Sequence, residues 1–161
     1  DKDKKKIVKS IVISSPITGI SANLDTAADE AFASRMMGDG AIVTPTDEIV
    51  VAPDDGEIIF VFDTKHAVGF TTKDGISMII HIGIDTVKLG GQGFSVLVKA
   101  GDKMKKGDTI MKLDLEYLKQ NAPSVASPVI CTELADNQKI RVVAEGKINA
   151  GEELFAIDFY E

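Results

Sequence analysis

The stretch TKHAVGFTTKDGISMIIHIGID, residues 64–85, reads as two short strands joined by a tight turn. Asp74-Gly75 is a pair that favours a two-residue hairpin turn, because Gly readily adopts a positive φ. The flanking segments are rich in Ile, Val, Phe and Thr, which suit a pleated surface. The stretch therefore predicts an antiparallel β-hairpin in the centre of the chain.

Short apolar segments also recur along the rest of the chain, separated by Gly, Pro, Asp and Asn. We expect strands near 7–14, 17–22, 41–44, 48–52, 57–62, 67–72, 76–82, 94–98, 109–114, 128–134, 139–145 and 153–159. Short helices are expected only over 27–37 and 115–121, and either could be a single turn. The pattern predicts an all-β fold, namely a single-domain antiparallel β-sandwich or barrel over residues 7–161 with short helical turns, preceded by a solvated tail or linker at residues 1–6.

Two pairs of similar segments predict an internal duplication. AGDKMKKGDTIMKLD (100–114) aligns without gaps on AEGKINAGEELFAID (144–158). SPITG (15–19) and APDDG (52–56) share the spacing of their Pro and Gly. Turns that precede strands also resemble one another, because Gly and acidic residues favour turns, and this remains an alternative explanation.

Composition restricts the classes of function. A chain of 161 residues can bury the core of one domain. Its formal charge of −7 repels nucleic-acid phosphates and acidic lipid headgroups. Cys131 is the only cysteine, so no internal disulfide can form. The sequence has no recognisable signal peptide and no apolar run long enough for a membrane span, so we expect a cytoplasmic protein without a transmembrane segment.

His66 and His81 are the only histidines, so any imidazole chemistry depends on them. With a two-residue turn at Asp74-Gly75, Val68 faces His81, and both imidazoles project from one face of the hairpin as diagonal neighbours. A three-residue turn would break this arrangement unless a bulge restores it. Thr64 falls on the same side as His66, where its hydroxyl can orient the ring. Each histidine alone is also compatible with a buried structural imidazole.

A pair of imidazoles suits reversible phosphoryl transfer. A neutral imidazole has one bare nitrogen, and its ordinary pKa of about 6.5 leaves that nitrogen available as a nucleophile near neutral pH. Transfer of a phosphoryl group then needs mainly in-line positioning and stabilisation of charge, which a second imidazole can supply through a hydrogen bond. An apolar surround with few waters slows hydrolysis.

Several motifs carry a resemblance to a known family. They are Gly38-Asp39-Gly40 with Pro45, Thr64-Lys65-His66-Ala67, HIGIDTV at 81–87, Gly93-Phe94 and Gly107-Asp108. In these motifs, and over residues 15–158, the chain resembles the glucose-specific enzyme IIA proteins and domains of the bacterial sugar phosphotransferase system. HIGIDTV is the most specific of them.

The resemblance implies a phosphotransferase component that acts through a phosphohistidine. His81 would accept phosphate from the carrier protein HPr and pass it to a cysteine of enzyme IIB. His66 would support the phosphoryl group, with Thr64 hydrogen-bonded to its ring. A location at the membrane would follow from fusion to, or docking on, a permease. The docking surface implied by the resemblance consists of Asp39, Asp85, Phe62, Val68, Phe70 and Ile79.

Three other classes remain as alternatives. A biotinyl or lipoyl carrier is suggested by the segment 100–110, although the usual Met-Lys-Met or Asp-Lys-Ala tip is missing. A zinc hydrolase would use His66, His81 and Asp85, although no HExxH motif is present. A regulatory binding module is compatible with phosphoryl transfer, because phosphorylation changes which surfaces fit. We expect no required cofactor, and zinc bound between the two histidines stays open.

Overall fold

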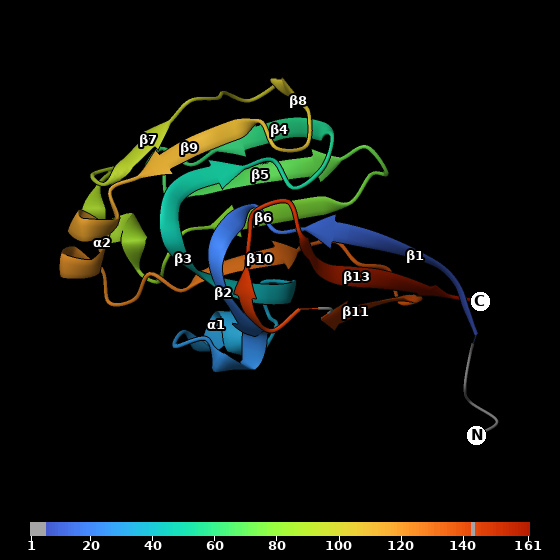
Figure 1. Cartoon of the computed structure of the whole chain (residues 1–161). Helices are drawn as coiled ribbons and strands as arrows, with labels where there is room; N and C mark the ends of the chain where they lie inside the picture. The colour runs from blue at the N-terminus through green and yellow to red at the C-terminus, as the bar shows by residue number, and fades with distance from the viewer. Residues whose placement is uncertain (1–5, 143) are drawn as a thin grey trace.

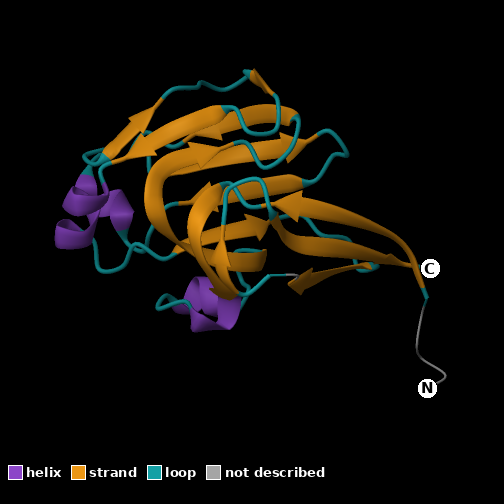
Figure 2. Cartoon of the chain, in the orientation of Figure 1, coloured by secondary structure: helices purple, strands orange, loops and turns teal. Residues whose placement is uncertain are grey.

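The computed structural model of the protein describes residues 6–142 and 144–161. Residues 1–5 of the predicted tail and residue 143 of the predicted strand 139–145 lie outside these residues. Strands are the main regular element of the described chain, and the short helices lie at its periphery (Figures 1 and 2). The predicted all-β class is confirmed.

The described residues form these elements in chain order. They are β1 (Ile7–Ser14), β2 (Ile17–Asn23), η1 (Leu24–Thr26), α1 (Glu30–Ala33), β3 (Asp39–Val51), β4 (Gly56–Val61), β5 (Ala67–Thr72), β6 (Ser77–His81), η2 (Thr86–Leu89), β7 (Phe94–Val96), β8 (Lys103–Met104), β9 (Thr109–Leu113), α2 (Leu115–Asn121), β10 (Ser127–Cys131), β11 (Gln138–Val142), β12 (Gly146–Ile148) and β13 (Glu153–Tyr160).

Two antiparallel sheets hold these strands. Over the described residues, the larger sheet has ten strands, with the order β12-β2-β3-β10-β6-β5-β4-β8 and with β9 joining β3 to β7. The smaller sheet has the order β1-β13-β11. The long strand β3 bends so that its start pairs with β10 and its end with β9, and the larger sheet curls around it (Figure 1). The predicted strands 41–44 and 48–52 are thus two parts of one bent strand.

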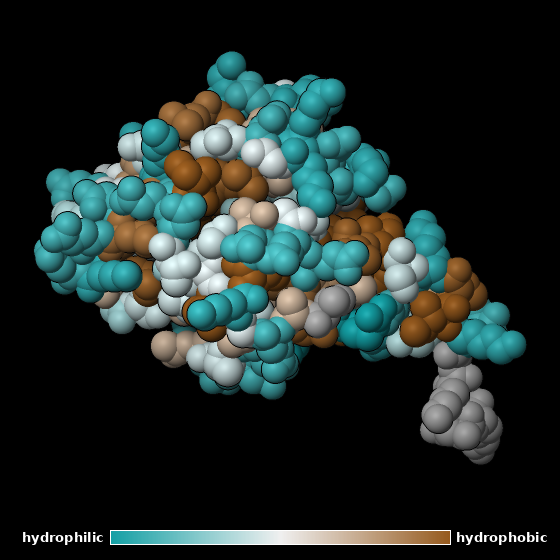
Figure 3. Space-filling model, in the orientation of Figure 1, coloured by the Kyte–Doolittle hydropathy of each residue, from teal (hydrophilic) through white to brown (hydrophobic). Residues whose placement is uncertain are grey.

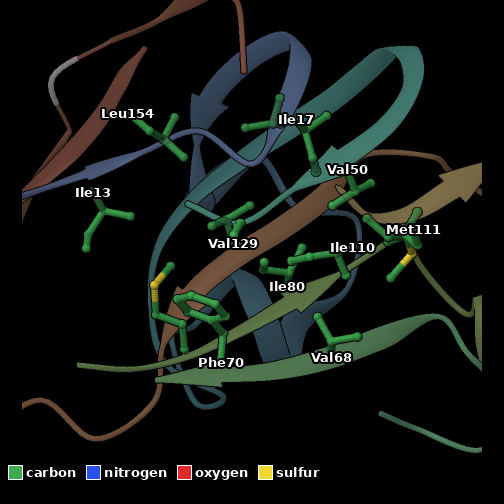
Figure 4. Close-up of a cluster of buried hydrophobic side chains, with 14 of the residues drawn as sticks. Ile13, Ile17, Val50, Val68, Phe70, Ile80, Ile110, Met111, Val129 and Leu154 are labelled. Atoms are coloured by element: carbon green, nitrogen blue, oxygen red, sulfur yellow. The ribbon is translucent and has the colours of Figure 1, made fainter. Parts of the chain in front are cut away.

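The main hydrophobic core lies inside the curled sheet, where the smaller sheet closes it (Figure 4). Large side chains from both sheets meet there without solvent exposure, among them Ile13, Phe155 and Ile80. Fully burying one such side chain contributes about 1.5–3 kcal/mol. A second, smaller cluster contains Phe32 of α1 and Ile130 of β10.

The predicted duplication is confirmed by recurring hydrogen bonds. The amide and the carbonyl of Ala52 bond to the turn 105–108 at 2.8 and 3.0 Å. Ser15 makes the corresponding two bonds to the turn 149–152 at 2.8 and 2.9 Å. In both copies the strand before the turn pairs with a glycine, since Met104 faces Gly56 and Ile148 faces Gly19. The two copies therefore share a strand–turn–strand geometry as well as a sequence.

The two helix predictions had different outcomes. The prediction over 115–121 is confirmed, and Asp114 caps this helix by accepting a hydrogen bond from the Tyr117 amide at 3.1 Å. Within 27–37 the helix is the single turn that the sequence also allowed, since α1 covers only Glu30–Ala33. The helix ends before Arg35, whose φ of 66° is left-handed and cannot continue a right-handed helix.

Some apolar side chains are exposed on the surface of the molecule. Brown, apolar atoms are visible at the projecting end of β1 and β13, where Ile7 and Val8 are 50% and 60% exposed (Figure 3). In the part of the chain that the structure describes, no helix is both long enough and apolar enough to cross a membrane.

The central hairpin formed as predicted but in a different register. Residues 73–75 make a three-residue turn, in which the Thr72 amide donates to the Ile76 carbonyl at 3.0 Å. The Thr72 hydroxyl also accepts from the Ile76 amide at 3.1 Å. As a result Ala67, and not Val68, faces His81. The predicted two-residue turn was wrong.

Gly69 provides a test of how closely β4 packs on β5. It faces Phe60, and a Cβ at position 69 would lie 2.2 Å from the Phe60 ring. We expect Gly69→Ala to lower the free energy of unfolding by about 1–3 kcal/mol, because the ring must move. In a Phe60→Ala background the same change should cost much less. Urea unfolding of the four proteins gives the coupling energy, and additive costs would contradict this packing.

Candidate functional site

The two histidines lie together at one end of the central hairpin. His81 is the last residue of β6, and His66 immediately precedes β5. Their ring centroids are 4.8 Å apart, with an interplanar angle of 82°. The imidazoles are therefore close enough for a group bound to one ring to contact the other.

His66 reaches this position because it lies outside the regular ladder. Since Ala67 faces His81, strict alternation would turn His66 towards the core. The preceding residue, Lys65, has a left-handed φ of 62°, and its amide donates to the Phe62 carbonyl at 2.7 Å. This tight loop frees His66 from the alternation. The adjacency of the two rings was predicted, but the reasoning from register was wrong.

One hydrogen bond fixes the tautomer of His81. Its Nδ1 lies 2.8 Å from the carbonyl oxygen of Gly83. A carbonyl can only accept, so Nδ1 carries the proton and donates it. The other ring nitrogen, Nε2, then bears the lone pair. The ring is half-buried and packs on Phe32, with the centroids 4.9 Å apart.

The ring of His66 is held by Thr64 and Phe62. Its Nδ1 lies 2.7 Å from the Thr64 hydroxyl, as expected from the sequence. The edge-to-face contact with Phe62 has a centroid distance of 5.2 Å. His66 is only 3% exposed. The ring therefore has few alternative orientations.

Burial keeps both imidazoles uncharged near neutral pH. Loss of hydration lowers the pKa of His66 to about 4, and the proximity of His81 acts in the same direction. Burial also lowers the pKa of His81, although the hydrogen bond to Gly83 and the charges of Asp29 and Asp85 oppose the shift. A neutral His81 with a bare Nε2 is a competent nucleophile.

An apolar cavity of about 210 Å³ opens beside His81. Its lining residues are Asp29, Ala31, Phe32, Met37, Phe62, Ile79, His81 and Ile130. The side chain of Asp29 caps α1 by accepting from the Ala31 amide at 2.8 Å. Sequence reasoning did not assign Asp29 or Phe32 to the site. The signal available was a helix-capping Asp with an aromatic residue three positions later, which is weak without the tertiary fold.

The predicted apolar docking residues fall on two sides of the sheet. Phe62 is 39% exposed beside His66, and Ile79 lines the cavity with His81. Val68 and Phe70 are instead fully buried in the main core (Figure 4). Their placement on the docking surface is corrected, because the three-residue turn puts them on the opposite side of the hairpin from Ile79.

The predicted acidic residues differ in how they are paired. Asp39 accepts a hydrogen bond from Nε of Arg35 at 2.9 Å, so its charge is locally compensated. Asp85 has a side chain 48% exposed and lies 4.0 Å from the Lys88 ammonium, which is a loose contact. The charge of Asp85 is therefore less compensated by a nearby cation than the charge of Asp39. Asp29 is a third acidic group near His81.

Two alternatives can be judged from the site. Within residues 6–142 and 144–161, no group of three or more His, Cys, Asp or Glu side chains is placed to hold a metal ion. The zinc-hydrolase set of His66, His81 and Asp85 is thus not assembled. Zinc between the two histidines stays a prediction, with its remaining ligands supplied by a partner. In the segment 100–110, which suggested a biotinyl or lipoyl carrier, Lys103 pairs with Glu57 on the neighbouring strand β4.

The fold and the site together define an all-β protein with two uncharged imidazoles in an apolar setting. Residues 11–137 match the family model described as phosphoenolpyruvate-dependent sugar phosphotransferase system, EIIA 1. The chain belongs to this EIIA family.

Similar proteins agree with this assignment. The glucose-specific EIIA component of Staphylococcus epidermidis is 43% identical over 138 residues, which are 86% of this chain and 83% of that protein. The structure of the glucose permease IIA from Mycoplasma capricolum has a TM-score of 0.85 and 34% identity, and the match covers 92% of this chain and 96% of that one.

Longer relatives contain a similar part. The glucoside-specific EIICBA component of Staphylococcus carnosus is 44% identical over 147 residues, or 91% of this chain. The N-acetylglucosamine-specific EIICBA component of Klebsiella pneumoniae is 46% identical over the same share. The chain spans 21% and 22% of these two proteins, about one fifth of their length.

The lowered pKa of His66 predicts a pH dependence of stability. Above pH 6.5 this histidine is neutral in both the folded and the unfolded chain. Below pH 6.5 the unfolded chain binds a proton that the folded protein does not bind until about pH 4, so stability falls as the pH falls through this window. The contribution of His66 is about 2–3 kcal/mol by pH 4.

Urea unfolding between pH 7 and pH 4 checks this expectation. His66→Gln has no titrating group at this position, so it should lose less stability than the wild-type protein over the same range. The difference between the two proteins removes the contribution of the carboxylates, which both share. Parallel pH profiles would contradict the lowered pKa.

Proposed function

We propose that the chain is a phosphocarrier that holds a phosphoryl group on Nε2 of His81 during sugar uptake. The observation that carries the proposal is the bond from Nδ1–H of His81 to the Gly83 carbonyl, which leaves Nε2 unprotonated. Membership of the EIIA family supports the same role. The donor in this proposal is the phosphohistidine of HPr, and the acceptor is a cysteine of enzyme IIB.

The two transfers balance as nucleophilic displacements at phosphorus. In the first, the lone pair on Nε2 of His81 attacks the phosphorus, and the bond to the HPr imidazole breaks with its electron pair returning to that imidazole. In the second, a cysteine thiolate of enzyme IIB attacks, and the bond from phosphorus to Nε2 breaks. Nδ1 keeps its proton throughout, because Gly83 holds it.

His66 supports the phosphoryl group in this proposal. We assign the Thr64 hydroxyl as the donor to Nδ1 of His66, which places the ring proton on Nε2. An uncharged Nε2–H group close to His81 can donate to a phosphoryl oxygen without being a competing acceptor. Phe32 and Phe62, which pack on the two rings, limit the access of water to the phosphorus.

The partners follow from the same site. The apolar surface around the cavity suits protein partners that exclude water during transfer. We propose that the sugar is set by the permease component that receives the phosphoryl group, since similar relatives carry names for glucose, glucosides and N-acetylglucosamine. We place the protein in the cytoplasm, either free or held at the membrane through a permease.

Incubation with phosphoenolpyruvate, enzyme I and HPr tests the proposal. Mass spectrometry should detect one acid-labile phosphate on the wild-type protein and none on His81→Gln, because Nε2 of His81 is the acceptor. Phosphate on His81→Gln would place the acceptor elsewhere.

His66→Gln is the matched variant for the second histidine. It should still accept one phosphate, because Nε2 of His81 is intact. Its transfer of phosphate to enzyme IIB should be about 10–100-fold slower, since a donor to the phosphoryl group is lost. Donation at the wild-type rate would exclude a role for His66 in the transfer.

Salt dependence tests the acidic residues near the site. Phosphorylation by HPr should slow as salt rises, because the Debye length falls from about 10 Å at 0.1 M to about 3 Å at 1 M. The double variant Asp29→Asn, Asp85→Asn should flatten this dependence, and α1 should keep its N-terminal cap because asparagine also caps helices. Asp47→Asn, an exposed residue of β3, is the control that removes charge elsewhere. Equal slopes for all three proteins would rule out steering by these carboxylates.

A further inference from the structure

The Gly83 carbonyl that holds His81 belongs to a turn fixed on several sides. Gly83 has a φ of 75°, in the left-handed region that favours glycine. A Cβ at this position would lie 2.6 Å from the Thr86 methyl group and 2.8 Å from the Ser124 carbonyl oxygen. The turn is therefore closely packed, and the direction of its carbonyl depends on its neighbours.

The peptide group after Gly83 is held at both ends. Its carbonyl oxygen accepts from Nδ1 of His81 at 2.8 Å. Its N–H, on Ile84, donates to the Ser124 carbonyl at 3.0 Å. Hydrogen bonds at the two ends of one peptide group polarise each other in the same sense, which strengthens the bond to His81.

The peptide group before Gly83 is held by two buried hydroxyls. Its carbonyl, on Ile82, accepts from the Thr86 hydroxyl at 2.5 Å. Its N–H, on Gly83, donates to the Ser127 hydroxyl oxygen at 3.1 Å. Neither Thr86 nor Ser127 is exposed to solvent. Four hydrogen bonds therefore hold the two peptide groups that flank Gly83.

Ser127 can act only as an acceptor towards Gly83. Its single hydroxyl proton is donated to the Val125 carbonyl at 2.8 Å. The oxygen therefore presents a lone pair to the Gly83 amide. Ser127 is the first residue of β10, so the hydroxyl is fixed to the same sheet that carries His81.

We propose that Ser127 is a positioning residue for phosphoryl transfer at His81. This inference rests on the proposed function. Ser127 holds the Gly83 turn so that its carbonyl points at Nδ1 of His81 and keeps the proton there. A free neutral imidazole in water favours the opposite tautomer, with the proton on Nε2, so the nucleophilic tautomer depends on this carbonyl. Without the hydroxyl, the Gly83 amide is buried and unpaired, and the turn relaxes.

Nitrogen-15 NMR of the unphosphorylated protein tests the positioning directly. The chain has two histidines, so the ring nitrogens of His81 can be assigned by comparison with His66→Gln. At neutral pH the wild-type protein should show protonated Nδ1 and bare Nε2 on His81. Ser127→Ala should shift His81 towards the other tautomer. This arm of the experiment needs no partner protein.

Ser21→Ala is the matched control. Ser21 is also buried, and its hydroxyl donates to the backbone carbonyl of Ala144 at 2.8 Å. On the sheet, Ser21 faces Val43 of β3. Ser127 faces the same Val43 from the other side of β3. Ser21→Ala should lose comparable stability and leave the His81 tautomer unchanged. If Ser127→Ala does not fold, Ser127→Cys keeps the side-chain volume with a weak acceptor, and an intermediate tautomer shift is expected.

The second-order rate of phosphorylation by phospho-HPr completes the test. We expect a fall of about tenfold in Ser127→Ala and less than a twofold change in Ser21→Ala. A wild-type tautomer in Ser127→Ala, whatever its rate, would overturn the proposal. So would a shifted tautomer with an unchanged rate. Failure of the wild-type protein to accept phosphate would instead reject the proposed function, while the NMR result on Ser127 would still stand.

Discussion

The alternation of side chains along β6 is the constraint on which the site depends. Met78 and Ile80 are buried in the main core, so Ile79 and His81 must face the other side of the sheet. Shifting this strand by one residue would expose the two core side chains and bury the imidazole among them. The free energy of core packing therefore holds His81 in place, and the site needs little energy of its own to position the ring.

Interactions across the sheet then determine what His81 can do. Ladder pairing places β10 beside β6, and Ser127 at the start of β10 and Ser124 just before it both bond to the Gly83 turn. On the other side, the loop before β5 brings His66 against His81. The tautomer of one ring and the orientation of the other are thus set by backbone geometry. Loops attached to a rigid sheet are suited to this task, because the sheet limits their movement.

The sequence predicted what depends on the pattern of residue types and missed what depends on particular side-chain contacts. The β-class, the hairpin and the duplication follow from alternation and turn residues, whereas the nearness of the histidines was predicted from a register that the structure does not have. The turn length was missed, because the Ile76 amide donates to the Thr72 hydroxyl and closes a three-residue loop. The helix over 27–37 is shortened at Arg35, which bonds to Asp25 and Asp39. The packing of Phe32 on His81 likewise requires the complete fold.

Two acidic groups act on His81, which we propose as the phosphate acceptor. The charges of Asp29 and Asp85 act on His81, and a phosphoryl group there would add about −1.5 to −2 charges close to them. Repulsion of this kind raises the free energy of the phosphorylated form, which a protein that stores phosphate would avoid. A carrier gains from it, because the phosphoryl group leaves more readily. A partner that brings positive charge is attracted by the same carboxylates, so they favour its docking beside the proposed phosphate acceptor.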